Sequence, residues 1–111
     1  MHHVIAQVTV VPLGTGSPSL SSWVAGVEKV LDDFPAIKHK LCPMSTVLEG
    51  ELDLILQAVR RMHEAPFMAG AQRVSTKLAI DDRRDKEITM DGKIRAVEEK
   101  MRPPHIGIEE K

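Results

Sequence analysis

The feature that most constrains this chain is the order in which strand-like and helix-like segments alternate along it. Residues 4–11 are rich in β-branched side chains, and shorter strand-like segments follow at 37–41, 45–49 and 72–80. Apolar residues recur at helical spacing before Pro35, again from Glu51 toward Pro66, and once more before residue 102. This pattern predicts four strands and three helices in the order β-α-β-β-α-β-α.

That order is the split βαβ, or ferredoxin-like, arrangement followed by one extra helix. Right-handed crossovers place the first two helices on one face of a four-stranded antiparallel sheet, with the first and third strands in the centre. The 111 residues are too few to divide into two cores. We therefore predict an α+β protein with a single domain over residues 1–102 and a C-terminal tail over 103–111.

The helix boundaries are predicted from side chains that accept hydrogen bonds from free backbone N–H groups. Ser19 or Ser21 is a candidate N-cap for the first helix, and Asp91 is one for the last. Proline ends helices because it lacks the N–H group, so the second helix is expected to close at Pro66 and the glycine region after it.

The second face of the predicted sheet carries no helix. Alternation along residues 4–11 places Ile5, Gln7, Thr9 and Val11 on that face, together with Val47 of the third strand. Such a mixture of apolar and polar side chains favours a homo-oligomer, a dimer or tetramer, in which the open sheet face is covered. The alternative is a half-solvated sheet face.

Composition excludes several classes of partner. Fifteen basic and sixteen acidic residues give a net charge of −1, and no basic run is longer than two residues, which argues against nucleic-acid binding. Prolines and glycines interrupt the uncharged stretch 4–27, so neither a signal peptide nor a membrane span is expected. The single cysteine favours a reducing compartment. We expect a cytoplasmic protein with no nucleic-acid or membrane partner.

The sequence offers little catalytic chemistry. His2 and His3 are adjacent, so a strand would point them to opposite faces, and they make a weak metal pair. Gly14-Thr15-Gly16 lacks the lysine and the full glycine spacing of a phosphate-binding loop. No nucleophile–base pair is apparent. We expect no enzymatic activity, no metal and no cofactor.

Glu49 is the residue with the most promising position, at a strand end close to Ser45 and Thr46. Its carboxylate there is able to accept hydrogen bonds from an amino-bearing ring, with the hydroxyl groups fixing the orientation. Equally, its charge is able to support the N-terminus of the next helix. Spacing alone does not separate these two roles.

Four blocks in order resemble the thiamine-binding protein family across residues 4–101. They are Pro12-Leu13-Gly14-Thr15-Gly16 with Ser19, the run Pro43-Met44-Ser45-Thr46-Val47-Leu48-Glu49-Gly50-Glu51, Gly70-Ala71-Gln72-Arg73-Val74, and Ile80-Asp81-Asp82-Arg83. The resemblance implies a small cytosolic protein without known catalysis that pairs through its sheets into tetramers. Thiamine or its hydroxymethylpyrimidine half is the implied ligand. The implied ligand-binding residues are Glu49, Thr46, Ser45, Gly14, Thr15, Ser19 and Arg73.

Two departures bear on the ligand. Ser45 stands where the family commonly has glycine, and Trp23 stands where tyrosine is frequent. The chain has three aromatic residues. A flat ligand is therefore expected to rest on Trp23, Phe67, aliphatic or methionine side chains, or a neighbouring subunit. The short chain favours a neighbouring subunit. The alternative is a structural or regulatory interaction module; an acylphosphatase-like enzyme is disfavoured because the chain has no Asn.

Overall fold

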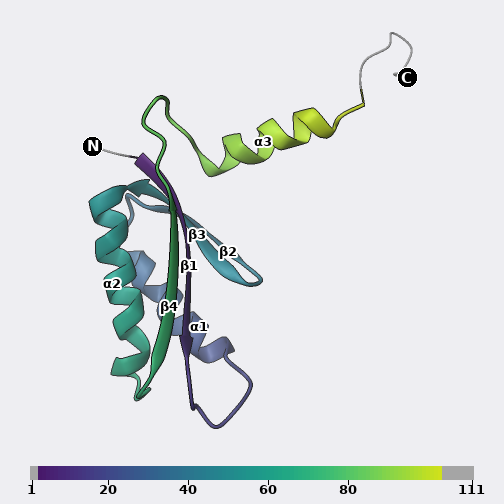
Figure 1. The fold of residues 1–111 in the computed structure, drawn as a ribbon. Helices are drawn as coiled ribbons and strands as arrows, with labels where there is room; N and C mark the ends of the chain where they lie inside the picture. Colours follow the sequence, from purple (N-terminus) through teal and green to yellow (C-terminus); the bar gives the residue numbers. More distant parts are fainter. Residues whose placement is uncertain (1–2, 104–111) are drawn as a thin grey trace.

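The computed structural model describes residues 3–103 and has the predicted α+β architecture (Figure 1). Four antiparallel strands form one sheet in the order β2-β3-β1-β4, so the first and third strands are central as predicted. The elements are β1 (His3–Pro12), α1 (Ser21–Lys29), a 3-10 turn (Val30–Asp33), β2 (Lys38–Cys42), β3 (Ser45–Glu51), α2 (Leu52–Met68), β4 (Val74–Asp81) and α3 (Met90–Met101). The predicted tail lies outside the described residues from 104 onward.

The hydrophobic core lies between the sheet and helices α1 and α2. Alternate residues of β1 face the helices, as the parity of the sequence predicts. They pack with Leu48 of β3 and with Ile55 and Met62 of α2, all three of which are almost completely buried. The β1 residues in this core are Val4, Ala6, Val8 and Val10.

Strand β1 extends beyond the end of its pairing with β3. Its register with β4 runs from Ile5 to Pro12, whereas its register with β3 ends at Val8, opposite Thr46. Within the described chain, the last residues of β1 therefore have a strand neighbour on the β4 side only. Backbone N–H and C=O groups on an unpaired strand edge are available to another partner.

The N-caps of two helices differ from the sequence prediction. Leu20 is the N-cap of α1, so neither Ser19 nor Ser21 caps it with a side chain. The end of α2 falls at Met68, within the predicted region between Pro66 and Gly70. Pro66 lies inside the last turn, where a proline removes a single helical hydrogen bond.

The cap of α3 was also predicted at the wrong residue. Thr89 is its N-cap, and its hydroxyl oxygen accepts the N–H of Gly92, whereas Asp91 lies in the first turn of the helix. An N-cap side chain usually accepts the N–H group of a residue two or three positions later. Thr89 does this with Gly92, so Thr89 and not Asp91 is the cap.

Helix α3 projects away from the sheet and makes few contacts with the other elements (Figure 1). Its apolar stripe is exposed: Ile94, Val97 and Met101 are 49%, 59% and 76% accessible. The segment leading into it is better packed, because Ile88 and Met90 are buried. An isolated helix of this length is marginal in water, so its N-terminal anchor matters.

Candidate functional site

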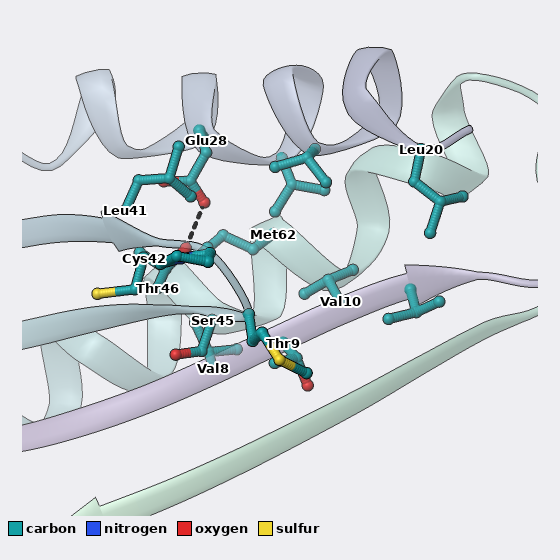
Figure 2. A pocket seen from close by; sticks show the side chains of 15 residues that line it. Val8, Thr9, Val10, Leu20, Glu28, Leu41, Cys42, Ser45, Thr46 and Met62 are labelled. Carbon is teal, nitrogen blue, oxygen red and sulfur yellow. Dashed lines mark hydrogen bonds between the residues drawn. The ribbon is translucent and has the colours of Figure 1, made fainter. Parts of the chain in front are cut away.

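A largely apolar hollow lies where β1 extends beyond β3. It has a volume of about 250 Å³ and is bounded by α1, the end of β1, and the turn between β2 and β3. Figure 2 shows Leu20 and Glu28 on the α1 side, with Val8 and Val10 on β1 and Met62 behind them. We call it the α1 pocket. Its other lining residues are Thr9, Val11, Val24, Val27, Leu41, Cys42, Pro43, Met44, Ser45 and Thr46.

A carboxylate and a hydroxyl group form the polar centre of the α1 pocket. Thr46 Oγ1 donates a hydrogen bond to Glu28 Oε2 at 2.6 Å, drawn as the dashed line in Figure 2. Thr46 is 4% exposed, whereas Glu28 is half-buried. The hydroxyl therefore holds the Glu28 side chain in one orientation, and the remaining carboxylate oxygen has acceptor sites for an N–H donor.

The rest of the wall is aliphatic and sulfur-containing. Valines of β1 and α1 form much of it, and Cys42, Met44 and Met62 contribute sulfur atoms. The described lining contains no aromatic side chain. Methionine and cysteine sulfur atoms make favourable contacts with aromatic rings, so a flat ring has suitable surfaces here. Of the surfaces considered from the sequence, the aliphatic and methionine side chains line this pocket, whereas Trp23 and Phe67 do not.

A second, more polar hollow of about 560 Å³ lies between the loop after β1 and the loop before β4. Gly14, Thr15, Trp23 and Arg73 are among the residues that line it. Gly14 has a φ of 73° and Gly70, also in the lining, has a φ of 105°, so both backbones lie in the region that favours glycine. We call it the loop hollow.

The structure divides the predicted ligand-binding residues among separate places. Ser45 and Thr46 line the α1 pocket, whereas Gly14, Thr15 and Arg73 line the loop hollow. Ser19 lies in the loop before α1, where its N–H group donates to Ser17 Oγ. Glu49 lines neither hollow. A single small ligand in the α1 pocket would therefore meet only part of the predicted set.

Glu49 is 7% exposed and both of its carboxylate oxygens have partners. Oε1 accepts the backbone N–H of Met90 at 2.8 Å, and Oε2 lies 3.0 Å from His3 Nε2. Met90 is the first residue of α3. The carboxylate thus supports a helix N-terminus, one of the two roles left open by the sequence, but the helix is α3 rather than α2. Glu51 caps α2 instead, accepting the N–H groups of Asp53 and Leu54.

Glu28 is the pocket residue that the sequence reasoning missed. Val24, Val27 and Leu31 recur at helical spacing before Pro35, and Glu28 lies four residues after Val24 in the same stripe. An acidic residue inside an apolar helical stripe is a signal that the side chain faces the interior. That signal was present in the sequence.

The described residues show neither a metal centre nor a membrane-spanning helix. Across residues 3–103, no cluster of His, Cys, Asp or Glu side chains has the arrangement needed to hold a metal ion. Within the same residues, no helix combines the length and apolar character needed to cross a membrane.

The chain is similar in sequence to known proteins. A family model described as "Thiamine-binding protein" matches residues 6–98. The chain belongs to the thiamine-binding protein family. A relative in Bacillus subtilis, UPF0045 protein YqgV, is 46% identical over 102 residues, which cover 89% of this chain and 98% of the relative.

Solved structures of similar proteins have the same fold. The Methanocaldococcus jannaschii protein MJ1052 has a TM-score of 0.81 and 37% identity, over 89% of this chain and 99% of that one. A Bacillus cereus domain of unknown function, DUF77, has a TM-score of 0.74 and 31% identity, over 84% of this chain and 88% of that one. The match to the thiamine-binding family supports a small-molecule-binding role, and the α1 pocket is the candidate site for it.

Proposed function

We propose that this protein binds thiamine or its hydroxymethylpyrimidine moiety, without catalysis, in the α1 pocket. The observation that carries the proposal is the Glu28–Thr46 pair within an otherwise apolar pocket, in a chain that belongs to the thiamine-binding family. The proposal also places the protein in the cytoplasm, where it holds its ligand as a homo-oligomer.

The chemistry of the pocket matches an aminopyrimidine ring. An exocyclic amino group donates hydrogen bonds, and the free oxygen of Glu28 accepts them. The ring nitrogens require donors or bridging waters, which the unpaired edge of β1 and the hydroxyl group of Ser45 are placed to provide. The two ring faces contact valine and sulfur-containing side chains. Small-ligand sites commonly combine mainly apolar walls with a few convergent polar groups.

Calorimetry with thiamine and hydroxymethylpyrimidine tests this placement. Thr46→Val keeps the side-chain shape but removes the hydroxyl group that orients Glu28, so we expect binding about tenfold weaker, equivalent to a hydrogen bond of about 1.4 kcal/mol. Thr15→Val is the matched control, because Thr15 lines the loop hollow. Circular dichroism verifies that both variants fold. Weaker binding by Thr15→Val with unchanged binding by Thr46→Val would move the ligand to the loop hollow.

The proposed oligomer uses the open sheet face. Val47 lies half-buried on this face in the central strand β3, beside the exposed Gln7 of β1 with which it pairs. Val47→Asp introduces a charge that a buried interface would have to desolvate, so we expect dissociation toward monomers by light scattering. Leu56→Asp, on the exposed surface of α2, is the control and should leave the mass unchanged. A wild-type protein that is monomeric at all concentrations would contradict this part of the proposal.

A further inference from the structure

The charge of the α1 pocket comes from one side chain. Among its fifteen lining residues, Glu28 is the sole carboxylate, and no lysine, arginine or histidine is present. The remaining polar groups in the lining are hydroxyls, a thiol and the backbone. A ligand in this pocket therefore meets one negative charge and no positive side chain.

Glu28 also differs in its surroundings from the carboxylates that form ion pairs with lysine or arginine. Asp33, Asp81 and Asp91 each pair with a lysine or arginine, at 2.6, 2.5 and 2.7 Å respectively. The contact recorded for Glu28 within residues 3–103 is the neutral hydroxyl of Thr46. A half-buried carboxylate beside apolar walls is stabilised by an opposite charge and destabilised by a like one. A positively charged ligand would therefore stabilise the Glu28 carboxylate.

We infer that the α1 pocket selects the positively charged, unphosphorylated form of its ligand and rejects the phosphate esters. This inference rests on the proposed function. Thiamine carries a fixed positive charge on its thiazolium ring, and its aminopyrimidine gains one on protonation. A phosphate group adds about two negative charges near neutral pH. In a partly enclosed site of low effective dielectric, that charge is repelled by Glu28 and finds no lysine or arginine in the lining.

The nearest alternative is that a phosphate extends out of the α1 pocket and reaches Arg73 in the loop hollow. Both hollows border the segment that joins β1 to α1, because Leu20 lines the α1 pocket and Leu13 lines the loop hollow. Arg73 is exposed. This alternative predicts the opposite ligand preference, with phosphate esters bound more tightly and with Arg73 required. The two possibilities therefore separate in one set of measurements.

The experiment is calorimetry on the full chain with four probes: thiamine, thiamine monophosphate, hydroxymethylpyrimidine and its phosphate. We expect each unphosphorylated compound to bind at least about tenfold more tightly than its ester. Glu28→Gln keeps the size of the side chain and its ability to accept from Thr46, but removes the charge. In this variant, the affinity for each unphosphorylated compound divided by the affinity for its ester should fall toward one. Glu64→Gln, on α2 and paired with Arg60, is the matched control and should retain the wild-type ratio.

The outcomes distinguish this inference from the function on which it rests. Equal binding of free compound and ester by the wild type would overturn the selectivity and leave the proposed function standing. Tighter binding of the esters, lost in Arg73→Ala, would overturn it in favour of a phosphate site in the loop hollow. Absence of binding for all four probes by folded wild-type protein would overturn both the proposed function and this inference. A ratio unchanged in Glu28→Gln would show that another group determines the preference.

Discussion

Replacing Glu49 by alanine separates the two roles that the sequence allows this carboxylate. In the structure its Oε1 accepts the N–H of Met90 at 2.8 Å and its Oε2 lies 3.0 Å from His3. The side chain is buried, and it lines neither the α1 pocket nor the loop hollow. The alanine variant leaves the Met90 N–H at the start of α3 without its acceptor. It should therefore loosen α3 and leave ligand binding intact.

The magnitude follows from the type of hydrogen bond that is lost. A hydrogen bond to a charged acceptor contributes about 1.5–3 kcal/mol, and a buried donor left unpaired costs a similar amount. Because α3 makes few other contacts with the body, this loss appears as local opening of α3 rather than as global unfolding. An opening free energy lowered by that amount accelerates amide exchange roughly 10- to 100-fold.

Hydrogen exchange measured by NMR reports this opening residue by residue. The Met90 amide should exchange faster in Glu49→Ala, followed by the Lys93 amide, which donates to the Thr89 carbonyl. Glu51→Ala is the matched control, because Glu51 caps α2 and its loss should affect Asp53 and Leu54 instead. The structural role is refuted if Glu49→Ala abolishes thiamine binding while the protection of Met90 is unchanged.

Two further substitutions test the core and the pH dependence of the α3 anchor. Ile55 is completely buried beneath the sheet, so Ile55→Ala should lower the free energy of unfolding, measured in urea, by about 2–5 kcal/mol. Leu56 is exposed, so Leu56→Ala should change this free energy little. Equal effects of the two substitutions would contradict this packing. The hydrogen bond and charge of Lys38 lower the pKa of Asp91 below its ordinary value of 3.8. The favourable contribution of this pair to α3 is therefore present above that ordinary pKa and is lost as the pH falls through the lowered one. NMR titration should show the pKa of Asp91 rising in Lys38→Met, and an unchanged pKa would exclude the pair as its cause.

Most of the fold was predictable because it depends on local periodicity. The parity of β1 correctly assigned Val4, Ala6, Val8 and Val10 to the core, and the element order determined the sheet topology. Caps were less predictable, because several neighbouring side chains are able to accept the same N–H group. Thr89 and Asp91 compete at α3, and the backbone conformation rather than the residue type decides between them.

The candidate site was less predictable because it depends on contacts between distant segments. Thr46 was included in the predicted set, but its partner Glu28 lies eighteen positions away on another element. Likewise, Glu49 was identified from the sequence as a carboxylate at the end of a strand. Nothing local indicates that Met90, forty-one positions later, returns to cover it. The sequence thus drew attention to Glu49, which lies in the same strand as Thr46 but does not line the α1 pocket.

The α1 pocket bears on the expectation that a neighbouring subunit would be needed to complete the site. Its polar centre, the Glu28 carboxylate and the Thr46 hydroxyl group, is formed within one chain. Thr46 and Val47 are adjacent in β3 and face opposite sides of the sheet, the first toward Glu28 and the second toward the open face. Substituting them one at a time therefore tests binding and assembly separately.

We expect Thr46→Val to weaken thiamine binding with no change in molecular mass, and Val47→Asp to lower the mass with little change in affinity. Calorimetry and light scattering on the same samples measure both properties. If folded, monomeric Val47→Asp also loses thiamine, then a partner subunit contributes to the site, and the reasoning that assigns the pocket to a single chain is wrong.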